Sequence, residues 1–115
     1  MVSAEFSRGT DWITMDVKGH AGFAELGKDP VCAGASVLAM TVAQCVDAMY
    51  QTGKLQKKPT LRLQNGRVTV TAKPKKEYFS EALHVFYVGQ TGFDLLAAAY
   101  PDYIIFKAIA PPEKG

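Results

Sequence analysis

The alternation of apolar and polar residues along the chain predicts five short strands. Residues 12–18 show it most clearly, because apolar side chains occupy every second position there. A turn at 8–11 joins this run to a second predicted strand at 3–6, so the chain is predicted to open with a β-hairpin. Runs at 60–64 and 67–73 flank Asn65-Gly66, a strong signal for a second hairpin. A fifth strand is predicted at 103–109, which is rich in aromatic and β-branched residues.

A helical period replaces the alternation at residues 30–51. Apolar residues recur there at intervals of three and four, which places them on one continuous stripe. The stripe is formed by Val31, Ala35, Leu38, Val42, Cys45 and Met49. Cys45 is therefore predicted to be a buried core thiol. Cys32 and Ser36 lie one residue off the stripe, stacked at i and i+4, where they can face the rim of a cleft. Gly53 is the expected stop of this helix.

A second helix is predicted at 80–100, although Gly89 and Gly92 lower its helix propensity. Its main apolar face comprises Ala82, Phe86, Phe93, Leu96 and Tyr100. Val85, Val88 and Leu95 lie on the other faces, so this helix is more apolar than packing on one sheet requires. The surplus indicates either a dimer contact or deep burial.

The predicted order of elements is ββαββαβ, which belongs to the α+β class. We expect two helices packed on a mostly antiparallel sheet, in a single pair of layers. A chain of 115 residues is long enough for one core. We assign that single domain to residues 1–110 and treat 111–115 as a C-terminal tail.

Composition excludes several classes of protein. The chain is 48% hydrophobic and 21% charged, which is typical of a globular domain rather than a disordered one. Its net charge of +2 is too small for a function driven by the charge of the whole molecule. No apolar run approaches the roughly 20 residues of a membrane span, and the first residues lack the pattern of a secretory signal. We therefore expect a cytoplasmic protein without a membrane segment.

The start of the first helix carries the candidate chemistry. Asp29 suits the N-cap, because its carboxylate can accept from N–H groups of the first turn, and Pro30 suits the first helical position. Cys32 then lies in the first turn, where the helix dipole stabilises negative charge. Since the thiolate is the nucleophilic form of cysteine, Cys32 is predicted to be an activated nucleophile. The N–H groups of Cys32 and Ala33 are expected to be unpaired there and are candidate donors to an oxyanion.

His20, which directly follows the second predicted strand, is the candidate general base. A neutral imidazole can take the thiol proton near neutral pH if it comes within about 3 Å of the sulfur. Gly19, Gly22 and Gly27 would let the connecting loop fold over a substrate. The alternative is that these glycines serve turn geometry alone.

The candidate site residues also have interpretations without chemistry. Asp29 is the helix cap in the interpretation we favour, or a third member that orients His20. Ser36 donates a hydrogen bond to the thiol or to the loop, or bonds back to a main-chain carbonyl. Cys32 is the nucleophile or simply a buried helix thiol. Cys32 and Cys45 cannot form a disulfide, because thirteen helical residues span about 20 Å and a disulfide needs about 7 Å. No spacing typical of a zinc site is present, so no metal is expected.

Two groups of lysines flank the second predicted hairpin. They are Lys54, Lys57 and Lys58 before it, and Lys73, Lys75 and Lys76 after it. Such groups usually form a solvated surface, but they would bind RNA or an acidic partner if the fold brought them together. The chain lacks the aromatic-rich strand motif of an RNA-binding sheet, so direct RNA binding is left open. The other histidine, His84, lies among apolar residues of the second predicted helix and is expected to be structural.

The residues around the candidate nucleophile resemble the signature of the ribosomal-processing cysteine protease Prp family. The similar segments are G-H-A at 19–21, G-x-D-x-V-C-A-x-x-S at 27–36 and Y-P-x-Y-I at 100–104. The order of elements is similar as well, so the resemblance covers nearly the whole chain. Pro30 stands where a β-branched or aliphatic residue is expected, and it is compatible with a helix start.

The resemblance implies an endopeptidase that removes the N-terminal extension of a large-subunit ribosomal protein, acting as a homodimer. It gives the catalytic roles to Cys32 and His20, places Asp29 and Ser36 in the motif, and makes Gly19 the flexible residue before the histidine. We expect no metal or organic cofactor. Two alternatives stay open: a non-enzymatic module that contacts ribosomal RNA through the lysines, and a thiol redox sensor at Cys32.

Overall fold

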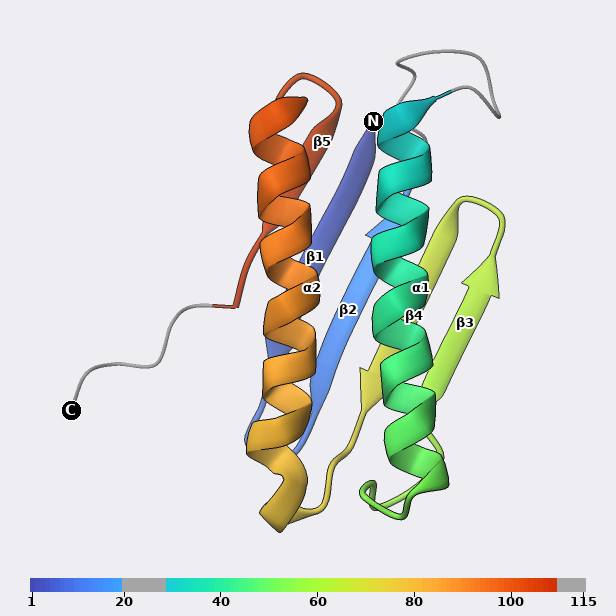
Figure 1. Cartoon of the computed structure of the whole chain (residues 1–115), viewed down its shortest axis with the longest axis vertical. Coiled ribbons are helices and arrows are strands. Elements are labelled where there is room, and N and C mark those ends of the chain that lie inside the picture. Colours follow the sequence, from blue (N-terminus) through green and yellow to red (C-terminus); the bar gives the residue numbers. More distant parts are fainter. Residues whose placement is uncertain (20–28, 110–115) are drawn as a thin grey trace, which may run out of the picture.

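The computed structural model describes residues 1–19 and 29–109, and in it two helices lie on one face of a five-stranded sheet (Figure 1). The elements are β1 (Val2–Arg8), β2 (Ile13–Lys18), α1 (Pro30–Gln51), β3 (Thr60–Gln64), β4 (Arg67–Ala72), a 3-10 turn (Lys76–Tyr78), α2 (Phe79–Ala99) and β5 (Ile104–Lys107). The predicted α+β class and element order are confirmed. The proposed tail at 111–115 lies outside the described residues, so the domain limit stays a prediction.

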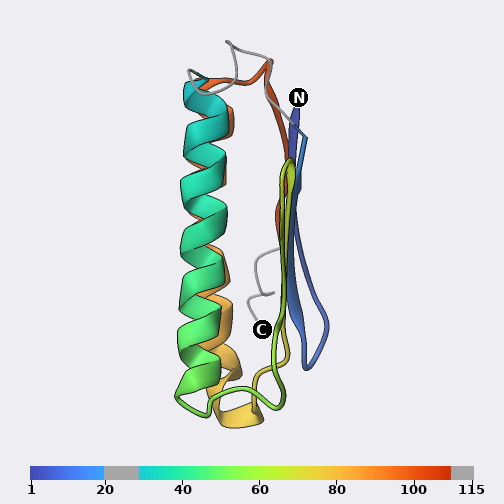
Figure 2. The same cartoon turned by 90° about the vertical axis from the view of Figure 1, so that its right-hand side faces the viewer.

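The sheet is open and mostly antiparallel. Its strand order is β3-β4-β2-β1-β5, and only β5 runs parallel to its neighbour β1 among the described strands. The pairing of β2 with β4 joins the two hairpins, and it leaves β3 and β5 as edge strands. Figure 2 shows both helices on the same side of the sheet. This is the single pair of layers that the sequence predicts.

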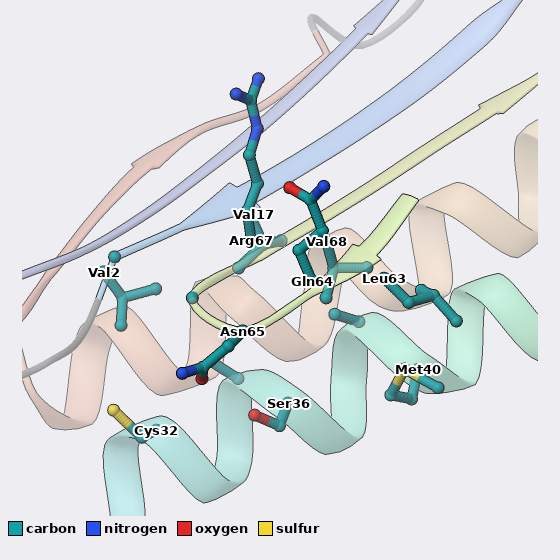
Figure 3. Close-up of a pocket in the computed structure, with 14 residues that line it drawn as sticks. Val2, Val17, Cys32, Ser36, Met40, Leu63, Gln64, Asn65, Arg67 and Val68 are labelled. Carbon is teal, nitrogen blue, oxygen red and sulfur yellow. The ribbon is translucent and has the colours of Figure 1, made fainter. Parts of the chain in front are cut away.

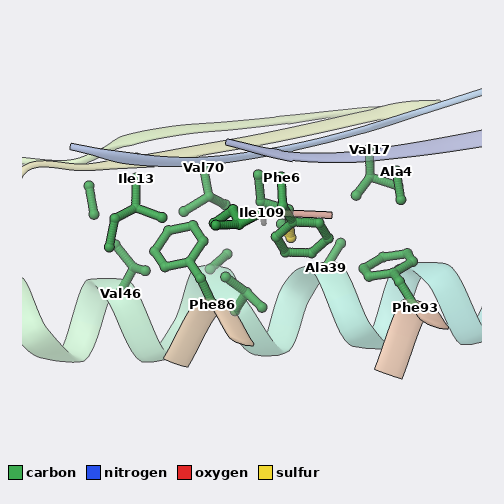
Figure 4. Close-up of a cluster of buried hydrophobic side chains, with 14 of the residues drawn as sticks. Ala4, Phe6, Ile13, Val17, Ala39, Val46, Val70, Phe86, Phe93 and Ile109 are labelled. Carbon is green, nitrogen blue, oxygen red and sulfur yellow. The ribbon is translucent and has the colours of Figure 1, made fainter. Parts of the chain in front are cut away.

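The core lies between the helices and the sheet. Phe86 and Phe93 project from α2 toward the strands and are fully buried (Figure 4). The ring of Phe93 meets the ring of Phe6 edge to face, with centroids 5.8 Å apart. Apolar residues at alternate positions of β1, β2 and β4 complete this layer, as their period of two requires.

The prediction that Cys45 is a core thiol is wrong, because Cys45 is exposed. The buried residues of α1 are Val31, Ala35, Ala39, Val42, Ala43, Val46 and Met49. Ala39, Ala43 and Val46 complete the face toward the sheet, so the buried sector is rotated away from Cys45. The two cysteines do not form a disulfide with each other, as predicted.

Helix α1 also corrects the expectation that no segment is apolar enough to cross a membrane. Its 22 residues are long enough and apolar enough to cross a membrane, by length and composition alone. Seven of them, however, are buried in the core. Packing against the sheet and α2 therefore accounts for the apolar character of this helix.

Helices α1 and α2 pack closely because glycines line the contact. A Cβ atom added at Gly89 would collide with the side chain of Val42, and one added at Gly92 would collide with Leu38. Both glycines are unfavourable for an isolated helix, yet in this fold they permit the approach of α1. The two helices therefore form one layer above the sheet (Figure 1).

Candidate active site

Asp29 fixes the start of α1. Its backbone is extended, and its Oδ1 atom accepts hydrogen bonds from the N–H groups of Val31 (2.9 Å) and Cys32 (3.1 Å). The residue is only 5% exposed. Pro30 occupies the first helical position, where its missing N–H costs no hydrogen bond. The predicted helix cap is therefore confirmed.

The same hydrogen bonds overturn the expected oxyanion donors. The N–H group of Cys32 donates to the carboxylate of Asp29, and the N–H group of Ala33 donates to the carbonyl oxygen of Asp29 at 3.0 Å. Neither group is unpaired, because one capping residue supplies both acceptors. The expectation that these two N–H groups are unpaired is therefore wrong.

Cys32 lines a cleft of about 350 Å³ between the first half of α1 and the β3–β4 hairpin. Its side chain is half-buried, and its sulfur atom points from the helix toward the cleft (Figure 3). Ser36 lies one turn further along on the same wall. The cleft-facing position predicted for these two residues is confirmed, whereas their chemical roles stay predictions.

Met40 extends the row of cleft residues on α1, since Cys32, Ser36 and Met40 are spaced four residues apart. Leu63 of the hairpin lines the cleft as well, and both Met40 and Leu63 are exposed large apolar side chains. The cleft is therefore polar near Ser36 and apolar further from the sulfur. The four-residue spacing was a signal in the sequence that could have revealed Met40.

Gly19 brings the end of β2 to the same cleft. It is one of the lining residues, and its N–H group donates to the carbonyl oxygen of Gly66 at 2.8 Å. Its φ of +96° lies in the left-handed region, and a Cβ atom there would collide with the carbonyl oxygen of Met1. Only glycine fits this position without strain. The backbone conformation therefore requires glycine at position 19, directly before His20.

Three of the predicted site residues lie outside the described part of the chain. They are His20, Gly22 and Gly27. The approach of His20 to the sulfur of Cys32, and the role of the glycines in a substrate loop, accordingly stay predictions. The structure does describe the two residues that flank this segment. Gly19 lines the cleft, and Asp29 caps α1, the helix that forms one wall of the cleft.

The β3–β4 hairpin is the part of the cleft that sequence reasoning missed. Asn65-Gly66 was assigned only as a turn, and the structure confirms the turn. In addition, the side chain of Asn65 extends from the hairpin toward the face of α1 that carries Cys32 and Ser36 (Figure 3). No local signal could have shown this, because it depends on the non-local pairing of β4 with β2.

Arg67 borders the cleft, but its charge is engaged elsewhere. Its guanidinium group forms an ion pair with Asp16 at 3.2 Å, and it points away from α1 (Figure 3). Partial burial raises the pKa of Asp16, but hydrogen bonds from Arg67 and Thr69 and the charges of Arg67 and Lys18 outweigh it. The pKa of Asp16 therefore lies below its usual value. This pair fixes the hairpin to β2 instead of placing a cation beside the sulfur.

Among the residues that the structure describes, no three His, Cys, Asp or Glu side chains are grouped so that they could hold a metal ion. The cleft residues instead offer a thiol, a hydroxyl and an amide. These groups suit nucleophilic attack on a carbonyl carbon, with hydrogen bonds to the charge that develops on its oxygen.

Comparison with known families decides the class of this protein. The sequence profile of the family described as cysteine protease Prp matches residues 1–105. The chain belongs to the Prp family. It is therefore a cysteine protease, and the alternative of a non-enzymatic module is wrong. No curated protein sequence matches the chain.

Three solved structures, two of them of Prp, show the same fold. The Staphylococcus aureus ribosomal-processing protease Prp, in complex with a covalently linked product peptide, is 20% identical with a TM-score of 0.67. The match covers 96% of this chain and all of that one. A Streptococcus mutans protein is 24% identical with a TM-score of 0.64, over 95% of this chain and 93% of its own. A second S. aureus Prp structure, in complex with a substrate peptide, is 18% identical with a TM-score of 0.64, over 96% of this chain and all of its own.

Proposed function

We propose that this Prp-family protease removes the N-terminal extension of a large-subunit ribosomal protein, in the cytoplasm, with Cys32 as nucleophile and His20 as general base. One observation carries the proposal. Cys32 lies in the first turn of α1 on the wall of a cleft, and Gly19, the residue before His20, borders the same cleft. The S. aureus relative in complex with a substrate peptide supports a peptide as the substrate of this chain.

The proposed reaction proceeds through an acyl-enzyme. His20 takes the proton of the Cys32 thiol, and the sulfur attacks the carbonyl carbon of the scissile peptide bond. The resulting tetrahedral oxyanion collapses, the C–N bond breaks, and His20 gives its proton to the leaving amine. A water molecule, deprotonated by His20, then attacks the thioester. The released carboxylate and the restored thiol complete the cycle without a cofactor.

Asn65 is the donor that we assign to the oxyanion. The N–H groups of Cys32 and Ala33 are engaged by Asp29, whereas the amide of Asn65 extends toward the wall that carries Cys32 (Figure 3). A hydrogen bond aimed at the oxyanion stabilises the transition state more than the substrate. Ser36, on the same wall, is available to bind the main chain of the peptide.

The protease is further proposed to act as a homodimer through the outer surface of α2. Val88 is 60% exposed and Leu95 is 68% exposed. The two are seven residues apart, so they lie on one side of the helix. The buried residues of α2 face the sheet and leave this apolar side available to a second copy of the chain.

The direct test is incubation with the N-terminally extended ribosomal protein from the same organism, followed by mass measurement of the products. Cys32→Ser is expected to abolish cleavage, because the hydroxyl is a far weaker nucleophile than the thiolate. Cys45→Ser is the matched control, since Cys45 is an exposed cysteine on the same helix outside that cleft. It should cleave at the rate of the unmodified protein.

The chain offers an equally close control for the base. It has only two histidines, and His84 is exposed on α2. His20→Ala should lower the cleavage rate by a factor of about 10² to 10⁴, whereas His84→Ala should not change it. A redox sensor would instead show reversible oxidation of Cys32 that does not depend on His20. Full cleavage by either Cys32→Ser or His20→Ala would overturn the assignment.

A further inference from the structure

One end of the molecule, opposite the start of α1, concentrates positive charge. We call it the basic end and define it by residues 8–12, 54–58 and 73–81, which lie together at the lower end of Figure 1. These segments contain seven of the thirteen lysines and arginines of the chain, but only three of its eleven acidic residues. The rest of the chain therefore carries a net negative charge, although the whole is close to neutral.

Main-chain hydrogen bonds bring the two lysine groups together. The N–H group of Gln56 donates to the carbonyl oxygen of Lys73 (2.8 Å), and the N–H group of Lys75 donates to that of Lys54 (3.0 Å). The side-chain amide of Gln56 also donates to the carbonyl oxygen of Pro74 at 2.9 Å. The segments after α1 and after β4 are thus fixed side by side. The fold therefore brings the two lysine groups together, which is the condition that the sequence analysis set for RNA binding.

Three of these lysines share a depression of about 170 Å³. It is lined by Asp11, Trp12, Lys57, Lys58, Thr60, Thr71 and Lys73. Lys73 pairs with Asp11 at 3.4 Å. Lys57 and Lys58 are exposed, and neither forms an ion pair with any carboxylate in the described segments. Lys54, like Lys73, is engaged by a carboxylate, since it pairs with Glu81 at 2.9 Å.

Trp12 adds an aromatic surface to this depression. It is a large apolar side chain left 39% exposed, and it packs against Gly9, where an added Cβ would collide with the indole. Contact with the hairpin turn therefore orients the ring, and part of its surface faces solvent beside the lysines. Single-stranded nucleic acids are bound by this combination, because phosphates pair with cations and bases stack on exposed rings.

We propose that the basic end binds single-stranded RNA, with Lys57 and Lys58 at the phosphates and Trp12 stacked on a base. An acidic protein segment would also satisfy the lysines, but it would make no use of the exposed indole. The RNA site lies beyond the opposite end of α1 from Cys32, and the 19 residues from Cys32 to Gln51 span roughly 29 Å at 1.5 Å each. RNA and a peptide can therefore be bound at the same time. This inference does not depend on the proposed peptidase reaction.

Fluorescence anisotropy with a labelled oligouridine of about twelve nucleotides tests the proposal on the full chain. The logarithm of the binding constant should fall linearly with the logarithm of the salt concentration. The double variant Lys57→Ala/Lys58→Ala should lose about tenfold in affinity and reduce the salt slope by about 1.4, because each lost phosphate contact contributes roughly 0.7. Trp12→Ala should weaken binding by about fivefold or more while leaving the salt slope unchanged.

Lys107→Ala is the matched control, because Lys107 is an exposed lysine on β5, outside the basic end. It should bind RNA nearly as the unmodified chain does. The proposal is overturned if RNA does not bind at about 50 mM salt, or if Lys107→Ala weakens binding as much as the double variant. Tighter binding of polyglutamate than of RNA would identify an acidic protein partner instead. Cys32→Ser should retain RNA binding and the lysine variants should retain peptide cleavage, so the two proposals fail separately.

Discussion

Asp29, which caps α1, has two possible roles that conservative substitutions separate. Asp29→Ala removes the acceptor for two N–H groups and should cost about 1–2 kcal/mol of unfolding free energy. Asp29→Asn keeps a capping oxygen and should cost much less. We expect Asp29→Asn to keep most of the peptidase activity, as a cap would. Chemical denaturation and cleavage rates measure both effects, and a stable but inactive Asp29→Asn protein would show that the carboxylate orients His20.

Asn65 allows a test of the oxyanion assignment that leaves the turn intact. Asn65→Asp keeps a residue that favours turns but replaces the amide N–H donor with a carboxylate. We expect kcat to fall by a factor of about 10² to 10³ with little change in KM, because the lost hydrogen bond forms in the transition state. Steady-state kinetics on a peptide substrate measure this. A variant with unchanged kcat would exclude Asn65 as the donor.

At the residue scale, the sequence predicted the start of α1 but not the whole of its hydrogen bonding. Asp29, Pro30 and Cys32 take the positions that the capping rules assign to them. The expected oxyanion donors fail because Asp29 engages the N–H groups of both Cys32 and Ala33. The sequence identifies Asp29 as a hydrogen-bond acceptor, but it does not show how many N–H groups of the first turn donate to it.

At the scale of whole elements, the contact between α1 and α2 sets the spacing of the helix layer. A Cβ atom at Gly89 would collide with Val42, which is itself in the core. Gly89→Ala should therefore lower the free energy of unfolding by about 1–3 kcal/mol, although alanine favours helix. Thermal or urea denaturation measures the loss.

The double variant Gly89→Ala/Val42→Ala tests whether the collision with Val42 causes the loss of stability expected for Gly89→Ala. Truncating Val42 removes the atoms that the new methyl group would meet. The cost of the double variant should thus be smaller than the two single costs added together. Strict additivity would mean that Gly89 is not needed for close packing.

The elements themselves were predictable because their signals are local. The alternating residues of β1 and β2 and the turn at Asn65-Gly66 each lie within a few positions of one another. The burial of Cys45 was predicted wrongly, because an apolar stripe does not show which part of it the sheet will cover. The hairpin wall of the cleft was missed for a related reason: it depends on β4 pairing with β2, a contact between distant segments.

At the scale of the whole molecule, the outer surface of α2 determines the expected assembly. Leu95→Asp places a charge in the proposed contact, so we expect this variant to be monomeric where the unmodified protein forms the proposed homodimer. Ile105→Asp is the control, because Ile105 is 58% exposed on β5 instead. Size-exclusion chromatography with light scattering measures the masses. A monomeric unmodified protein, or dissociation by Ile105→Asp, would contradict the proposed interface.

The hydrogen bond between Gly19 and Gly66 links two parts of the molecule that are far apart in sequence. It ties the tip of the β3–β4 hairpin to the strand end that leads into His20. A compound or antibody fragment that bound the outside of this tip would shift the strand end that precedes the proposed general base, without occupying the proposed peptide cleft. Inhibition of that kind would not be relieved by adding more substrate.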